Sequence, residues 1–200
     1  MQNESGIASN TVPNIVPNIA PNIFLIGMPG AGKTTVGKAL AKQLALRFVD
    51  ADKELVSRTG VSIATIFEIE GEPGFRAREV ELITKLVLER GIVLATGGGA
   101  ILDANNRTAL REHGAVVYLQ AGLAELRERT RRDTKRPLLQ GDDPEAVLNA
   151  LLQVREPLYR EAAHIVVNAS RENIGRLAQQ IIDELTSLGM LAKVRGIEIP

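Results

Sequence analysis

The chain contains no cysteine, no tryptophan and only two histidines among its 200 residues. The absence of cysteine excludes disulfide bonds and thiolate metal sites, and it fits a reducing compartment. The histidines, His113 and His164, do not have the spacing of metal ligands. We therefore expect a cytoplasmic protein in which both histidines are structural.

The chain also lacks net charge, because 24 basic residues balance 24 acidic ones, and aromatic residues make up only 3% of it. Nucleic-acid-binding surfaces usually combine excess positive charge with aromatic side chains for base stacking, so the composition argues against such a partner. No apolar stretch approaches the roughly 20 residues that a membrane-spanning helix needs. The sequence thus predicts a soluble protein with no nucleic-acid and no membrane partner.

Hydrophobic residues make up 44% of the chain, which is enough for one domain with a sizeable core. We expect this domain to span residues 23–188. Residues 1–22 end in repeats of a Pro-Asn-Ile unit, and proline at every fourth position forbids a helix, so they are predicted to form a flexible arm. Residues 189–200 are predicted to form a C-terminal tail.

Short β-branched runs alternate with helical patterns along this domain. The runs predict strands buried on both faces, at residues 23–26, 47–50, 91–96, 115–119 and 164–167. Helical spacing recurs at residues 79–89, 123–132, 144–154 and 174–188. This alternation predicts an α/β fold with a parallel sheet, whose ligands bind at the carboxyl ends of the strands.

Residues 27–34 match the phosphate-binding pattern G-x-x-x-x-G-K-[ST] at every fixed position. An apolar run precedes this phosphate loop and helical spacing follows it, as the pattern requires. Glycines let backbone N–H groups surround a phosphate, while Lys33 can reach the outer phosphates and Thr34 can place a hydroxyl on Mg²⁺. The loop therefore predicts a bound nucleotide.

Two carboxylates, Asp50 and Asp52, follow the second predicted strand. In an extended segment both would point toward the phosphate end of the sheet, where one could help to hold Mg²⁺ and the other accept a proton from an attacking hydroxyl. The alternative is that Asp52 caps a helix that begins near Glu54. The pair alone leaves both interpretations open.

Two further features suit an anionic ligand but also have plainer explanations. Residues 97–99, three glycines after the third strand, permit close backbone approach to a ligand or form a flexible turn. Arg76 carries the planar guanidinium that suits a carboxylate, although most arginines are solvated.

Residues 127–136 hold six basic side chains against two acidic ones, which suits a solvated helix face or a lid that closes over transferring phosphate. Arg136 precedes a proline and is expected on a mobile loop. Arg129 and Arg132 are expected on a solvated helix face.

These motifs together resemble the shikimate kinase family, from about residue 23 to residue 185. The resemblance rests on the phosphate loop and on further motifs in the same order, at residues 48–52, 66–79, 96–99, 136–139 and 155–159. It implies transfer of the γ-phosphate of ATP to the 3-hydroxyl of shikimate, in the pathway to chorismate and the aromatic amino acids. The implied fold has three α/β/α layers, a five-stranded parallel sheet in the order 2-3-1-4-5 and a mobile lid, in a monomer.

The resemblance also implies the residues of the site. ATP would be bound by Gly30, Ala31, Gly32, Lys33, Thr34, Thr35, Arg136 and Arg171. Shikimate would be bound or enclosed by Asp52, Phe67, Phe75, Arg76, Glu79, Gly97, Gly98, Gly99 and Arg155, of which Arg155 pairs with the substrate carboxylate. Mg²⁺ would bind Thr34 directly and Asp50 through water. The implied catalytic residues are Lys33, Asp52 and Arg136.

Three other functions are alternatives. A kinase for gluconate or another small hydroxy acid or sugar is the nearest, and the combination of Arg76, Arg155 and the three glycines favours shikimate over it. A catalytically silent nucleotide-binding module would not need the full set of charged residues. A GTPase would carry an Asn-Lys-x-Asp segment, which the chain lacks.

Overall fold

The computed structural model describes residues 22–131, 144–169 and 173–191. Among these residues no helix is both long and apolar enough to cross a membrane. The elements, in chain order, are β1 (Asn22–Ile26), α1 (Lys33–Leu44), β2 (Arg47–Asp50), α2 (Ala51–Thr59), α3 (Ile63–Leu86), β3 (Ile92–Ala95), the 3-10 helix η1 (Ala100–Leu102), α4 (Ala104–His113), β4 (Gly114–Gln120), α5 (Leu123–Thr130), α6 (Pro144–Ala162), β5 (Ile165–Asn168) and α7 (Ile174–Ser187).

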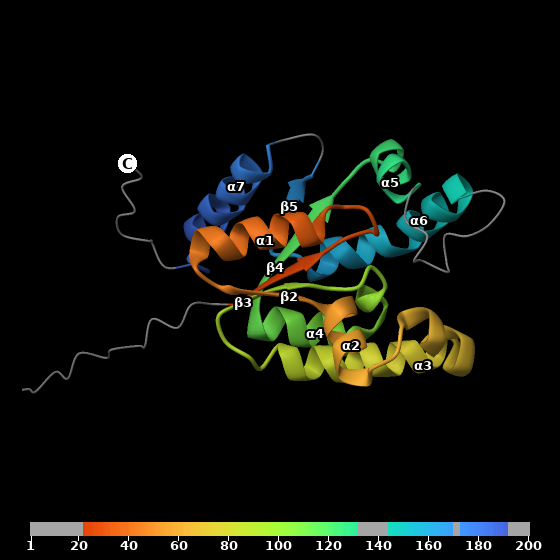
Figure 1. The fold of residues 1–200 in the computed structure, drawn as a ribbon. Coiled ribbons are helices and arrows are strands. Elements are labelled where there is room, and N and C mark those ends of the chain that lie inside the picture. Colours follow the sequence, from red (N-terminus) through yellow and green to blue (C-terminus); the bar gives the residue numbers. More distant parts are fainter. Residues whose placement is uncertain (1–21, 132–143, 170–172, 192–200) are drawn as a thin grey trace, which may run out of the picture.

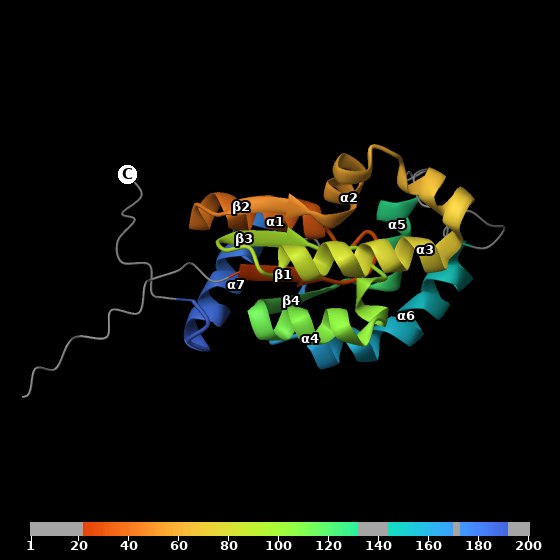
Figure 2. The same ribbon diagram turned by 90° about the horizontal axis from the view of Figure 1, so that it is seen from below.

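The strands form one parallel sheet in the order β2-β3-β1-β4-β5, which confirms the predicted order. Helices α1 and α7 cover one face of the sheet, and α3 and α4 cover the other, so the domain has three layers (Figure 1, Figure 2). Because all strands run in the same direction, their carboxyl ends meet at one edge, where ligands bind in folds of this kind.

Burial differs between the centre and the edges of the sheet. Every residue of β1 and β3 is buried, as expected of strands covered by helices on both faces. The edge strand β5 instead alternates between buried and exposed residues, and β2 buries only Val49. The prediction that all strands are buried on both faces is therefore right for the centre and wrong for the edges, which the helices cover less completely.

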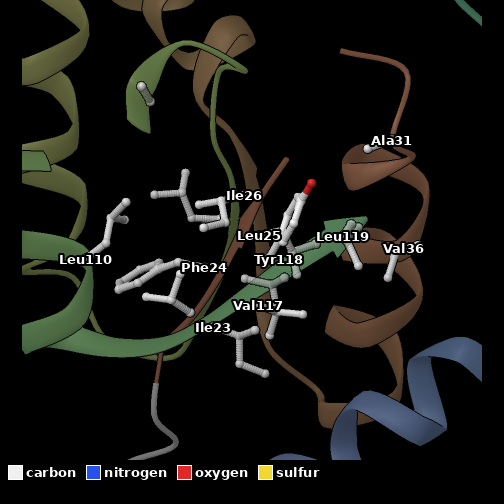
Figure 3. Packing of buried hydrophobic residues seen from close by; sticks show 14 of the residues in the cluster. Ile23, Phe24, Leu25, Ile26, Ala31, Val36, Leu110, Val117, Tyr118 and Leu119 are labelled. Carbon is white, nitrogen blue, oxygen red and sulfur yellow. The ribbon is translucent and has the colours of Figure 1, made fainter. Parts of the chain in front are cut away.

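The hydrophobic core fills the space on both sides of the central strands. Phe24 lies next to Leu110 of α4 on one side, and Val36 of α1 lies near Leu119 on the other (Figure 3). These side chains are at most 1% exposed. Because both faces of the central strands are packed, the loops that follow β1 and β3 are held in place at their first residues.

Asn22 begins β1, although the proline repeats predict that it belongs to the amino-terminal arm. Its side-chain amide donates to the carbonyl oxygens of Glu89 at 2.6 Å and Val87 at 3.2 Å, and its side-chain oxygen accepts the N–H of Ile92 at 3.2 Å. These bonds tie the start of β1 to the segment that enters β3. At the other end of the domain, Leu191 is 7% exposed and still contacts the core.

The helices differ from the prediction in length and in number. α3 begins at Ile63, with a non-helical break at Gly71, where φ is 69°, and α6 continues past Pro157 to Ala162. Helix α4 was not predicted, and α2 was predicted only as one of the two interpretations of Asp50 and Asp52. Each buries only two residues, so neither gives a strong periodic signal in the sequence.

Candidate active site

The phosphate loop connects β1 to α1 at the carboxyl edge of the sheet (Figure 1). Gly30 and Gly32 have φ values of 83° and 93°, a region that favours glycine, and α1 begins directly at Lys33. The positive end of the α1 dipole therefore lies at the loop, as a phosphate site requires. The side chain of Ala31 is buried and that of Thr35 is exposed, so Ala31 offers a ligand only its backbone.

Lys33 is only 8% exposed and its side chain folds back over the loop. Its ammonium donates hydrogen bonds to the carbonyl oxygens of Gly27 at 2.8 Å and Met28 at 3.0 Å. These bonds hold the positive charge inside the loop, where it would meet the charge of a bound phosphate.

Thr34 and Asp50 meet beside the loop, since the Thr34 hydroxyl donates to Oδ2 of Asp50 at 2.8 Å. The other carboxylate oxygen of Asp50 accepts the backbone N–H of Lys53 at 3.3 Å and so caps α2. A helix therefore starts immediately after β2, and Asp52 lies in its first turn. Of the two interpretations left open, the extended segment through Asp52 is therefore wrong and the helix start is right, although the capping residue is Asp50 rather than Asp52.

The oxygen atoms of Thr34 and Asp50 are the hard ligands that Mg²⁺ prefers. The described residues contain no group of three or more His, Cys, Asp or Glu side chains that could hold a metal ion. Mg²⁺ usually takes one or two protein oxygens together with substrate phosphates and water, so this small donor set fits it better than it fits an ion that needs a protein cage.

A second group of side chains surrounds residues 97–99. We call Asp52, Arg76, Glu79 and Arg155, together with Gly97, Gly98 and Gly99, the glycine-loop cluster. They come from α2, α3, the turn after β3 and α6. Each glycine is approached so closely that a methyl group would collide with a neighbour: Glu79 Oε1 would lie 2.2 Å from a Cβ on Gly97, Pro29 Cδ 2.7 Å from one on Gly98, and Arg76 Nη2 2.3 Å from one on Gly99.

Glu79 is the most deeply buried carboxylate of this cluster, at 3% exposure. Its Oε2 accepts a hydrogen bond from Arg76 at 2.6 Å, while its Oε1 has no hydrogen-bond partner among the described residues. Burial raises the pKa of Glu79 above its ordinary value, and nearby Asp52 adds to this, although Arg76 and Arg155 oppose it. A buried oxygen in this position is suited to accept a hydrogen bond from a ligand or an ordered water.

Arg76 lies between two glutamates on α3. It donates to Glu79 and also to Glu72, at 2.9 Å from Nη2, and its guanidinium lies 5.1 Å from the centre of the Phe75 ring. Burial alone would lower the pKa of Arg76, but the two glutamates outweigh it and raise the pKa. The ring of Phe75 also packs against Phe67, with centroids 4.8 Å apart, so Phe75 links the second predicted aromatic residue to this arginine.

Arg155 approaches the glycines from α6 and is 3% exposed. Its Nη1 donates to the carbonyl oxygen of Gly98 at 3.2 Å, and its buried Nε has no partner within the described part of the chain. A buried guanidinium with an unused donor is a strong candidate to bind an anion. The structure thus brings together the predicted residues Asp52, Arg76, Glu79 and Arg155, which come from three separate helices.

Arg129 lies on the exposed face of α5, as predicted, but its guanidinium also reaches the phosphate loop. From α5 it donates to the carbonyl oxygens of Gly30 at 3.3 Å and Ala169 at 3.0 Å, and so connects the phosphate loop to the segment after β5. No local pattern distinguishes it from its basic neighbours, and only the fold places α5 over the loop. Arg132, Arg136 and Arg171, like most of the predicted lid, lie outside the described residues.

Comparison with known proteins gives a consistent result. A family model described as shikimate kinase matches residues 29–186. The shikimate kinase of Nitrosospira multiformis is 54% identical over 82% of this chain and 84% of its own length, and that of Burkholderia thailandensis is 51% identical over 86% and 93%. A solved structure of shikimate kinase from Acinetobacter baumannii in complex with shikimate is 46% identical, with a TM-score of 0.84 over 89% of this chain and 97% of that one.

Proposed function

The chain belongs to the shikimate kinase family, and we propose that it transfers the γ-phosphate of ATP to the 3-hydroxyl of shikimate, giving shikimate 3-phosphate. The observation that supports this most directly is the place of the glycine-loop cluster. Gly98 packs against Pro29 of the phosphate loop, so a substrate held by the cluster lies next to the end of a bound nucleotide.

The composition of the cluster fits a small polyol that carries one carboxylate. The unused donor of Arg155, with Arg76 beside it, suits the carboxylate. The carboxylate of Asp52 suits a hydroxyl, which it can orient and deprotonate as the phosphoryl group transfers. The buried Oε1 of Glu79 is a further acceptor, and on α3 the ring of Phe75 lies against Arg76 and packs on Phe67.

On the nucleotide side, Lys33 neutralises the outer phosphates, and residues 30–35 surround them. Thr34 and Asp50 would hold Mg²⁺, which would neutralise developing charge on the phosphates. We include Arg136 and Arg171 among the ATP contacts on the family resemblance alone. We include a monomeric state on the family resemblance, and the use of ATP with a small metabolite supports a cytoplasmic location.

The proposal is tested by coupled ADP release with shikimate, quinate, gluconate and nucleoside monophosphates as acceptors. We expect turnover with shikimate in the presence of Mg²⁺ and little with the others. Preference for gluconate would show that the cluster recognises a different hydroxy acid. No turnover with any acceptor, together with retained ATP binding in calorimetry, would indicate a silent nucleotide-binding module.

A further inference from the structure

Tyr159 lies at the junction between the phosphate loop and the glycine-loop cluster. Its hydroxyl donates a hydrogen bond to the carbonyl oxygen of Gly98 and lies 3.9 Å from the sulfur of Met28 in the phosphate loop. The residue is 0% exposed, so its hydroxyl makes both contacts away from bulk water. Tyr159 thus contacts both halves of the site from α6.

The carbonyl oxygen of Gly98 is a shared acceptor. Arg155 donates to the same oxygen at 3.2 Å, and it precedes Tyr159 by four residues, so the two side chains leave the same face of α6. Pro29 approaches Gly98 from the phosphate loop, with Cδ 2.7 Å from the position of a Cβ. One peptide group is therefore held by two donors of α6 and by the phosphate loop.

The ring of Tyr159 is itself held firmly in place. It stacks on Tyr118 of β4, with ring centroids 4.9 Å apart and 19° between the planes. Burial raises the pKa of Tyr159 far above its ordinary value, so the hydroxyl stays a donor throughout the working pH range. The stacking on Tyr118 thus fixes the position of the Tyr159 hydroxyl oxygen relative to the central sheet.

We propose that Tyr159 is a positioning residue, which holds the Gly98 peptide and Arg155 in register with the phosphate loop. This inference rests on the proposed function, because it assumes that Arg155 and the glycines bind the acid substrate. Loss of the hydroxyl frees the Gly98 carbonyl to rotate and leaves Arg155 as its only α6 donor. The acid substrate then binds more weakly, whereas ATP still meets Lys33, whose bonds to Gly27 and Met28 do not involve Tyr159.

The test compares Tyr159→Phe with Tyr118→Phe, which removes the hydroxyl of the other ring in the stack and leaves Gly98 untouched. We expect the shikimate Kd from calorimetry and the shikimate KM to rise about 3- to 10-fold in Tyr159→Phe, the loss of one hydrogen bond. The KM for ATP should stay within about twofold, and Tyr118→Phe should leave both substrates within the same limit. Assays are run well below the melting temperature of each variant.

A Tyr159→Phe variant that melts earlier but keeps the wild-type shikimate Kd and KM would overturn the inference and leave a purely structural role. A wild-type protein that does not bind shikimate would instead overturn the proposed function, and this inference with it. If Tyr159→Phe does not fold, the near-isosteric replacements Tyr159→4-fluorophenylalanine and Tyr159→4-aminophenylalanine carry the test. The amino variant keeps a donor and should match the wild type, while the fluoro variant should lose affinity, and equal affinities would contradict the proposal.

Discussion

The phosphate loop and the glycine-loop cluster face each other across the same site but are built in opposite ways. The loop is one contiguous segment, and its geometry depends on positive φ angles and on the start of α1. The cluster takes side chains from α2, α3 and α6 and closes them around three glycines. The comparison suggests that changes in the loop will impair the chemical step, whereas most changes in the cluster will impair binding of the acid substrate.

Lys33→Met tests the loop side and has the largest expected effect. A neutral side chain cannot balance charge on the transferring group, so we expect kcat to fall about 10³- to 10⁵-fold, as when other charge-stabilising groups are removed from phosphoryl-transfer sites. Circular dichroism should show an intact fold. Lys38→Met, on the exposed side of α1, is the matched control, and equal turnover in the two variants would refute the assignment of the loop.

Asp52→Asn tests whether one member of the cluster acts on rate rather than on binding. If Asp52 orients or deprotonates the attacking hydroxyl, kcat should fall about 10²- to 10⁴-fold, with little change in the KM for ATP. Because Asp50 caps α2, the melting temperature should change little. Asp103→Ala, which removes the side-chain cap of α4, is the control that should lose stability but keep its rate. The reverse pattern would make Asp52 a structural residue.

Gly97→Ala tests the binding side of the comparison. The backbone of Gly97 does not have a positive φ, so the added methyl acts through space alone, and it would lie 2.2 Å from Glu79 Oε1 and 3.2 Å from Asp52 Oδ1. Overpacking of about 1–3 kcal/mol corresponds to a rise of roughly 5- to 150-fold in the shikimate KM. In Gly122→Ala, where the nearest atom is 3.9 Å away, kinetics should be unchanged. A Gly97→Ala enzyme with normal shikimate KM would show that the cluster tolerates displacement of its carboxylates.

Arg129→Ala tests whether the phosphate loop depends on a contact from outside residues 27–34, namely the hydrogen bond from Arg129 of α5. Loss of the bonds to Gly30 and Ala169 should raise the KM for ATP about 2- to 10-fold, with the shikimate KM unchanged. Arg127→Ala removes an exposed arginine of the same helix, paired with Glu145, and provides the comparison. The same small change in both variants would mean that the loop is self-sufficient.

His164 belongs neither to the phosphate loop nor to the glycine-loop cluster. Its replacement should have the smallest effect of these variants, and the effect should be on stability rather than on kinetics. Its Nδ1 accepts the backbone N–H of Val116 at 2.9 Å, and burial together with Arg111 lowers its pKa. The unfolded chain therefore binds more protons than the folded one below about pH 6.5, so this contribution to stability is present above that pH and is lost as the pH falls. His164→Asn keeps a hydrogen-bond acceptor but does not titrate. When the pH is lowered, we expect the melting temperature of this variant to fall by about 1–2 °C less than that of the wild type. An identical pH profile would contradict this.

The elements that sequence reasoning found are those with a local signal. The phosphate loop was found because its spacing is fixed, and the strands because they are short apolar runs that end in turns. Helix α4 was missed and α2 stayed one of two open interpretations, because each helix buries only two residues. The residue that caps α2 was misassigned because both aspartates fit an extended segment equally well. Arg129 and Tyr159 carried no signal of their own, since their contacts lie across the fold.

The sequence by itself determined the nucleotide loop, the alternation of strands and helices, and the family, because each depends on residues close together in the chain or on motifs in a fixed order. Only the tertiary structure decided that Asp50 caps α2 while it accepts the Thr34 hydroxyl, that Glu79 is buried between two arginines, and that one carbonyl of Gly98 serves both Arg155 and Tyr159. Those features depend on the distances between helices that pack together only in the folded protein. The spacing of residues along the chain does not give these distances.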